Sequence, residues 1–266
     1  MQRVLNEIIK LRKLDFSQYK EKLIERKVEF RLKATHSDSY EEYLKFLQNN
    51  PKEIDLLLNE LTINVTRFFR DYPIFMAIKD KIIPALLANT DFIRIWSCGC
   101  SSGEEAISVL ILLLEHLEEL ASKNKLNKQP TIMIYGTDID KLIIEKAKTA
   151  IYEEYEFYEM PKIYQQKYFL DLGNKKFAFK KEYHKYLVFQ VKDIINDPPL
   201  RNIQLILCRN LFIYFKAELQ KICLSKFYQA LKSHGFLVTG PTELLSNKAG
   251  INFKEYDIKH RIFIKN

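Results

Sequence analysis

The chain has 266 residues, 47% of them hydrophobic, which is enough to bury the core of one large domain and one small one. Its formal net charge of +8 favours an acidic partner, whether nucleic acid, an anionic membrane surface or an acidic protein. No apolar run approaches the roughly 18 residues of a membrane-spanning helix, and the start lacks a signal-peptide pattern. We therefore expect a cytoplasmic protein without membrane insertion.

Four cysteines lie in apolar segments, which are too few for a disulfide framework and agree with a reducing compartment. Cys98 and Cys100 have a C-x-C spacing, but no cluster of His or Cys completes a metal site. We expect them to pack around a turn and expect no metal.

Residues 1–62 are predicted to form a small all-helical domain. The first 60 residues contain no Gly and only one Pro, and apolar residues recur at helical spacing near 40–47 and 54–61. Ser37 and Asp38 are suitable residues to start the helix that follows them. Residues 1–33 carry ten Lys or Arg against five acids, which indicates either a docking face for an acidic partner or an ordinary solvated helix face.

Residues 63–266 are predicted to form an α/β domain. From residue 92, strand-like and helix-like segments alternate, as expected for a parallel sheet that is covered on both faces. The expected strands are 92–98, 131–138, 186–193, 203–210 and 235–240, and the expected helices are 103–120, 140–152 and 216–231. The class is α/β, a doubly wound, Rossmann-like sheet.

Two segments depart from this alternation. Residues 151–186 are rich in aromatic residues and fit no single crossover helix, so we expect a small inserted β-subdomain with a short hairpin around Gly173 and Asn174. Residues 253–266 look like strand material with no helix before them, which predicts an antiparallel strand at the edge of the sheet.

Polar residues follow the first two strands of the predicted sheet. The turn Gly99–Gly103 permits close backbone approach to a ligand, and Glu104 and Glu105 open the next helix. Asp138 is placed to accept the hydroxyls of a ribose, as in dinucleotide and adenosylmethionine sites. Because two glutamates at a helix start disfavour a pyrophosphate, a cationic cofactor such as S-adenosylmethionine fits better, unless the glutamates merely stabilise the helix start.

Five segments, in their order and spacing, resemble the CheR family of chemotaxis receptor methyltransferases over residues 60–245. They are NVTRFFRD (64–71), WSCGCSSGEEAIS (96–108), GTDID (136–140), LILCRNLFIYF (205–215) and GFLVTGPTE (235–243). The resemblance implies a class I S-adenosylmethionine-dependent methyltransferase that esterifies glutamates on chemoreceptor helices. It also implies a helical N-terminal domain that faces the receptor.

The resemblance also implies site residues. The cofactor would be bound by Asn64, Thr66, Arg70, Gly99, Glu104, Asp138, Asp193, Ile194, Arg209 and Asn210. Arg70 or Arg209 would hold the incoming carboxylate, and Tyr214 would orient it near the transferred methyl group. As alternatives, Asn64 and Thr66 form a helix cap and Tyr214 is a core tyrosine.

The chain departs from the family pattern at three places. Asp193 stands where the family usually has Asn, and Pro241 in GPTE stands where the family has His in GHSE. The segment 151–186 lacks the extra glycines that accompany docking of a receptor-tail pentapeptide in some members. We therefore expect an enzyme that contacts chemoreceptor helices without that pentapeptide. We also expect a monomer.

A glutamate carboxylate is already ionised at neutral pH, so methyl transfer to it requires no general base. Two rival functions remain open. A nucleic-acid methyltransferase shares the fold and the positive charge, but INDPPL (195–200) precedes the fourth strand and is better explained as a turn than as a base-clamping motif. The other rival is a non-catalytic sensor of S-adenosylmethionine.

Overall fold

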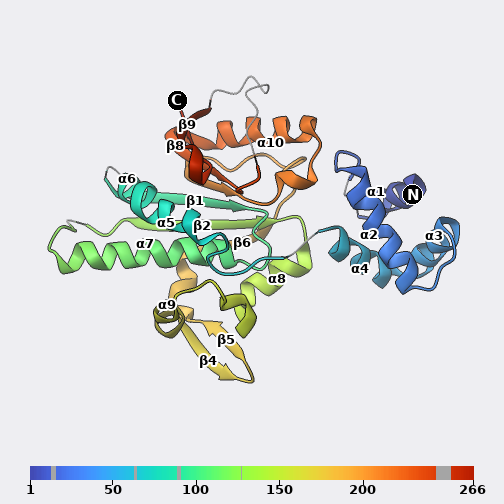
Figure 1. Ribbon diagram of the computed structural model, residues 1–266, viewed down its shortest axis with the longest axis horizontal. Coiled ribbons are helices and arrows are strands. Elements are labelled where there is room, and N and C mark those ends of the chain that lie inside the picture. Colours follow the sequence, from blue (N-terminus) through green and yellow to red (C-terminus); the bar gives the residue numbers. More distant parts are fainter. Residues whose placement is uncertain (13–15, 63–64, 89–90, 127, 244–252) are drawn as a thin grey trace. The chain divides into compact units, whose positions relative to one another are not determined.

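The protein is described here from a computed structural model, which places residues 1–12, 16–62, 65–88, 91–126, 128–243 and 253–266. Contacts between residues divide the chain into two compact units (Figure 1). The helical unit comprises Met1–Asn64 together with Phe212–Ile222, and the α/β unit comprises Val65–Leu211 together with Cys223–Asn266. Residues 212–222, which follow the predicted strand 203–210, thus belong to the same compact unit as the N-terminus.

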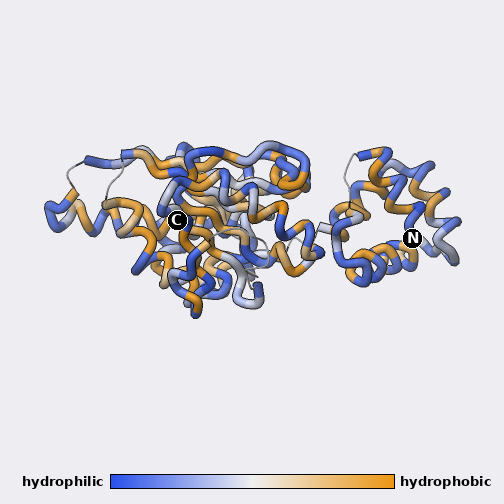
Figure 2. The backbone as a smooth tube through the Cα atoms, turned by 90° about the horizontal axis from the view of Figure 1, so that it is seen from above, coloured by the Kyte–Doolittle hydropathy of each residue, from blue (hydrophilic) through white to orange (hydrophobic). Residues whose placement is uncertain are grey.

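The helical unit confirms the expected helices. They are α1 (Gln2–Arg12), α2 (Glu21–Ala34), α3 (Tyr40–Asn49) and α4 (Pro51–Leu61). Hydrophobic and hydrophilic residues alternate along each helix (Figure 2), because one face of each is buried in a shared core. The predicted start of α3 was wrong by one or two positions, since Ser39, and not Ser37 or Asp38, accepts a hydrogen bond from the Glu42 N–H at 3.2 Å.

Residues 212–222 join this unit through backbone contacts. The Lys20 N–H donates to the Tyr214 carbonyl at 2.9 Å, and the Lys216 N–H donates to the Gln18 carbonyl at 2.9 Å. The rings of Tyr19 and Phe215 meet edge to face, with centroids 5.0 Å apart. These contacts hold the 3-10 turn Phe212–Tyr214 and the start of α10 (Ala217–Ala230) against the residues that precede α2.

The α/β unit is built on a seven-stranded sheet of order β6-β2-β1-β7-β8-β10-β9. Its strands are β1 (Phe92–Cys98), β2 (Thr131–Asp138), β6 (Leu187–Val191), β7 (Ile203–Cys208), β8 (Leu231–Thr239), β9 (Phe253–Asp257) and β10 (Ile262–Lys265). The pairs from β6 to β8 are parallel, and β10 and β9 are antiparallel to their neighbours. The doubly wound sheet is confirmed, and the predicted edge strand is in fact a pair of strands.

Helices cover both faces of this sheet, as Figure 1 shows for α7 (Glu104–Ser122) and α10. Trp96 of β1 packs against Phe227 of α10, with ring centroids 5.5 Å apart. Ile93 and Ile95 point the other way, into the core shared with α5 (Tyr72–Ala77), α6 (Ile83–Leu87) and α7. In the part of the chain that the structure describes, no helix combines the length and apolar character needed to cross a bilayer.

The inserted β-subdomain is present at residues 151–186. Its elements are β3 (Ile151–Glu153), the 3-10 helix Glu154–Phe157, α9 (Lys162–Tyr168), β4 (Phe169–Gly173), β5 (Lys176–Phe179) and the 3-10 helix Lys181–Tyr186. The strands form a separate antiparallel sheet of order β3-β5-β4, and the predicted hairpin at Gly173 and Asn174 joins β4 to β5. Helix α8 (Lys141–Thr149) leads from β2 into this subdomain.

An acid of α4, Glu53, lies buried in the core of the helical unit. Glu53 of α4 is 4% exposed and accepts two hydrogen bonds from the Arg31 guanidinium, at 2.9 and 2.7 Å. The Tyr43 hydroxyl donates to the same carboxylate at 2.8 Å, and burial together with Glu53 raises the pKa of Tyr43. This network joins α2, α3 and α4 through one carboxylate.

We expect Glu53→Ala to destabilise the helical unit by about 3 kcal/mol, because the Arg31 charge and the Tyr43 hydroxyl would lose their shared partner. Hydrogen exchange of the α2 and α4 amides measures this loss without requiring the two units to unfold together. The matched control is Glu41→Ala, which breaks an ion pair with Arg3 whose side chains are both 78% exposed and should change stability by less than about 1 kcal/mol. Equal effects of the two substitutions would contradict the argument.

Candidate cofactor and active site

The turn Gly99–Gly103 lies at the carboxyl end of β1, where ligands bind in open α/β sheets. The N–H groups of Gly99 and Cys100 donate to the Thr137 carbonyl of β2 at 2.8 and 3.0 Å. Gly103 has φ +95°, and a Cβ there would stand 2.7 Å from the Phe189 ring. A glycine is therefore required where the turn enters α7.

Asp138 ends β2 beside this turn. Its Oδ2 accepts the Ser101 N–H at 3.0 Å and its Oδ1 accepts the Asp140 N–H at 3.1 Å, which fixes the carboxylate and leaves each oxygen a further lone pair. Burial is the main reason that the pKa of Asp138 is raised to about 6. The structure thus presents an oriented acid at the position where a ribose would be held.

Glu104 opens α7 directly after the glycine turn. Its side chain is fully buried, Oε1 accepts the Ser102 hydroxyl at 2.7 Å, and Oε2 has no partner among the described residues. Burial raises the pKa of Glu104 to about 8. The contact of Glu104 with the cofactor stays a prediction.

Glu105 was expected only to open α7 beside Glu104, and the structure places it against Ser97 and Arg209. Its Oε1 accepts the Ser97 hydroxyl at 2.7 Å, and its Oε2 lies 3.2 Å from Arg209 Nη1. Consecutive helical residues point about 100° apart, so only one of two adjacent glutamates can face the end of β7. No pattern in the sequence decides which one does.

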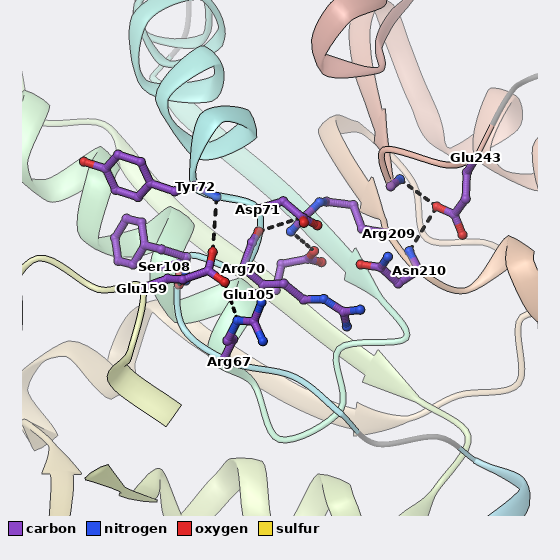
Figure 3. Close-up of polar contacts among 12 residues, drawn as sticks. Arg67, Arg70, Asp71, Tyr72, Glu105, Ser108, Glu159, Arg209, Asn210 and Glu243 are labelled. Atoms are coloured by element: carbon purple, nitrogen blue, oxygen red, sulfur yellow. Dashed lines mark hydrogen bonds and ion pairs between the residues drawn. The ribbon is translucent and has the colours of Figure 1, made fainter. Parts of the chain in front are cut away.

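Arg209 lies at the centre of the polar contacts in Figure 3. Its Nη2 donates to the Arg70 carbonyl and to Asp71 Oδ2, both at 2.7 Å, and its guanidinium carbon lies 5.2 Å from the centroid of the Phe75 ring. The side chain is only 2% exposed. Its charge is engaged by Asp71 and Glu105 and shielded from solvent. The predicted roles of Arg209 toward the cofactor and the incoming carboxylate stay predictions.

Arg70 is the more accessible of the two arginines. It is partly exposed, and its Nη1 donates to the Val65 carbonyl at 2.8 Å. Thr66 is partly exposed on the same segment, and Asn64 lies outside the described residues. The roles of all three residues toward the cofactor stay predictions.

Asn210 is held by a bridge between two strand ends. Its N–H and the Gly240 N–H both donate to Glu243 Oε2, at 3.0 and 2.6 Å (Figure 3). Glu243 is 4% exposed, and Asn210 has φ +60°, a left-handed conformation that asparagine tolerates. Glu243, which lies in the GPTE segment, thereby fixes the backbone that follows β7.

Asp193 and Ile194 lie in the turn after β6. Asp193 Oδ1 accepts the Ile195 N–H and Oδ2 accepts the Asn196 amide, both at 2.7 Å, so this acid shapes its own turn. The turn interpretation of residues 195–200 is consistent with these bonds. Contact of Asp193 and Ile194 with an adenine stays a prediction.

Tyr214 belongs to the segment 212–222 of the helical unit, where it is partly exposed and its carbonyl accepts the Lys20 N–H. Its predicted position near the transferred methyl group stays a prediction.

The chemistry of these groups fits a cofactor with a ribose and positive charge. Asp138 offers oriented acceptor oxygens beside the glycine turn, and Glu105 lies on the first turn of the next helix. No arginine or lysine from the turn itself is placed to receive a phosphate, because residues 99–105 contain neither. Fold and site together define a Rossmann-like S-adenosylmethionine-dependent methyltransferase.

Comparison with protein families gives the same result. Residues 64–262 match the model described as the CheR methyltransferase, SAM binding domain, and residues 1–62 match that described as the CheR methyltransferase, all-alpha domain. The chain therefore belongs to the CheR methyltransferase family, and S-adenosylmethionine is its cofactor.

Individual relatives extend the similarity over most of the chain. A chemotaxis protein methyltransferase from Borreliella burgdorferi is 30% identical over 249 residues, covering 90% of this chain and 86% of that protein. One from Vibrio cholerae is 28% identical, covering 89% of this chain and 82% of that protein. A 104.1 kDa protein from Rhodobacter capsulatus is 29% identical over 94% of this chain, which spans only 26% of that larger protein.

We expect the affinity for adenosylhomocysteine to fall as the pH drops below about 6, approaching tenfold per pH unit, because protonated Asp138 loses an acceptor for the ribose hydroxyls. Calorimetric titration between pH 5 and 8 measures this. Asp138→Asn should bind more weakly and show a flatter profile. A profile as steep in Asp138→Asn as in the unmodified protein would contradict the assignment.

Protonation of Asp138 affects stability and cofactor binding in opposite directions. Burial raises the pKa of Asp138 in the folded state from 3.8 to about 6, so the folded state binds more protons than the unfolded chain between these values. Asp138 therefore contributes more stability at low pH and loses that contribution as the pH rises through this window. A loss of affinity at pH 5 is thus not explained by unfolding that Asp138 causes.

Proposed function

We propose that the protein transfers the methyl group of S-adenosylmethionine to glutamate side chains on the cytoplasmic helices of chemoreceptors. The proposal rests mainly on a pair of arginines. Arg209 is buried between two acids and donates a hydrogen bond to the backbone carbonyl of Arg70. Arg70 itself is partly exposed. An accessible cation on a fixed backbone beside the cofactor acids is suited to a carboxylate substrate.

The residues of the chain have to position groups and exclude water, because the acceptor glutamate is already ionised at neutral pH. S-adenosylmethionine supplies an activated methyl group on a sulfonium. Arg70 would orient the acceptor carboxylate, Asp138 would hold the ribose, and Tyr214 would orient the acceptor through its hydroxyl. Positioning of this kind can lower a barrier by roughly 7–11 kcal/mol.

The helical unit supplies a surface for an acidic partner. Lys22, Arg26 and Lys33 are exposed residues of α2 at spacings of four and seven, so they share one helix face, on which Glu29 is an exposed acid. Other cations of this unit are engaged, since Arg12 pairs with Asp55 and Arg31 with Glu53. We infer that this α2 cationic face meets the acidic stretches that present the receptor glutamates.

Location and assembly follow as parts of the same proposal. A receptor helix that carries methylation sites lies on the cytoplasmic side, so the enzyme acts in the cytoplasm. We propose that it acts as a monomer and without docking a receptor-tail pentapeptide. The names of the relatives from Borreliella burgdorferi and Vibrio cholerae, both chemotaxis protein methyltransferases, support the pathway.

The direct test uses S-adenosylmethionine labelled in its methyl group and a cytoplasmic chemoreceptor fragment. We expect label on the receptor that mild base releases as methanol, because carboxyl methyl esters hydrolyse there and N-methyl groups do not. A receptor fragment with its acceptor glutamates replaced by alanine is the control and should remain unlabelled. Base-stable label, or label on added nucleic acid, would favour the rival methyltransferases, and cofactor binding without any transfer would favour a sensor.

Charge reversal of the α2 cationic face tests the partner. The triple substitution Lys22→Glu, Arg26→Glu and Lys33→Glu should raise KM for the receptor fragment at least about tenfold, because like charges would then oppose docking. The affinity for adenosylhomocysteine should not change.

The matched control reverses three exposed lysines of the α/β unit, Lys232, Lys254 and Lys259, and alters the net charge by the same amount. It should change the KM for receptor much less, since it leaves α2 intact. Equal effects of the two triple variants would show that only the overall charge matters and would remove the role of α2.

A further inference from the structure

The turn that carries the cofactor site adopts an unusual backbone conformation. Gly99, Ser101 and Gly103 have φ values of +72°, +49° and +95°, so three residues of five are left-handed. Ser101 is not a glycine, and this conformation is unfavourable for it. A turn of this kind keeps one geometry only when surrounding groups fix it.

Two side chains from outside the turn bind its backbone. On one side, Asp138 accepts the Ser101 N–H, as described above. On the other side, the Tyr152 hydroxyl donates to the Ser102 carbonyl at 2.8 Å, and Tyr152 is fully buried. Asp138 belongs to the central sheet, whereas Tyr152 lies in β3, the first strand of the inserted β-subdomain.

The position of Tyr152 is itself strongly determined. Its ring meets Phe68 edge to face, with centroids 4.7 Å apart, and burial keeps its hydroxyl neutral by raising its pKa. Phe68 also stacks on Phe157 at 4.8 Å and donates its N–H to the Glu156 carbonyl at 3.0 Å. The subdomain therefore packs against the segment that carries Arg70 and reaches the glycine turn through one hydroxyl.

We propose that Tyr152 is a positioning residue for the cofactor, and that the inserted β-subdomain sets the affinity for S-adenosylmethionine through its hydrogen bond to Ser102. The juxtaposition of a buried donor with a strained turn carries this proposal. Loss of the donor leaves the Ser102 carbonyl without this bond and lets the turn populate geometries that bind the cofactor less well. The subdomain thereby takes part in cofactor binding in addition to any contact with a partner.

The test is Tyr152→Phe in the full chain, with Tyr168→Phe as the matched control. Tyr168 is also fully buried in the subdomain, and its hydroxyl donates to Glu115 Oε1 at 2.7 Å, far along α7 from the turn. We expect Tyr152→Phe to weaken adenosylhomocysteine binding about fivefold or more by calorimetry and to raise the KM for S-adenosylmethionine equally. The kcat at saturating cofactor should stay within about twofold, and Tyr168→Phe should leave the affinity unchanged.

A measurement on the unmodified protein keeps the proposal testable even if Tyr152→Phe does not fold. Binding is reciprocal, so adenosylhomocysteine should slow hydrogen exchange in peptides covering 151–157 as well as 99–104, and should leave those covering 165–170 unchanged. Protection confined to 99–104 would overturn the proposal. So would equal losses of affinity in the two Phe variants, which would indicate a general effect of the subdomain on stability.

Discussion

A buried guanidinium between two carboxylates is the interaction on which the site of this protein depends. Arg209 at the end of β7 binds Asp71, Glu105 and the carbonyl of Arg70, so one side chain joins three segments that are far apart in the sequence. Removing one partner of such a buried arrangement would leave an uncompensated charge, which is far more destabilising than the loss of a surface ion pair. The geometry of the segment 65–71 is thus tied to the central sheet, and so is the position of Arg70.

Much of this architecture could be predicted from the sequence because it follows from hydrophobic periodicity. The alternation of apolar strand and helix segments from residue 92 predicts the parallel sheet, and the composition of 151–186 predicts the inserted subdomain with its hairpin. The two strands at the C-terminal edge were harder to predict as separate strands. A 3-10 turn between Asp257 and Arg261 divides them, and its sequence resembles that of a continuous strand. Membership of residues 212–222 in the helical unit depends on long-range backbone contacts that no local pattern contains.

The site was predicted less completely, and the reasons are geometric. Motif spacing brings Asp138 and the glycine turn together, because both follow parallel strands that are neighbours in the sheet. It does not reveal which of Glu104 and Glu105 faces Arg209, since helical phase at a helix start depends on the turn before it. Tyr152 was wrongly predicted to end the helix 140–152, because the helical spacing continues past Thr149, where α8 ends, whereas Tyr152 lies in β3. A tyrosine in an aromatic-rich segment also has the appearance of an ordinary core residue.

The raised pKa values around the turn have a physical meaning for the cofactor. Burial raises the pKa of Glu105 and of Asp138, because their surroundings disfavour the charged carboxylates. Arg209 lowers the pKa of Glu105, and backbone N–H groups lower that of Asp138, but they offset only part of the effect of burial. Perturbed acids of this kind cluster at functional sites. A cofactor that brings positive charge and hydroxyl donors to this edge of the sheet would favour the ionised forms and would bind the folded chain alone. The turn, its two external hydrogen bonds and the buried Arg209 are then parts of one arrangement, in which the protein fixes the carboxylates of Asp138 and Glu105 at the carboxyl edge of the sheet.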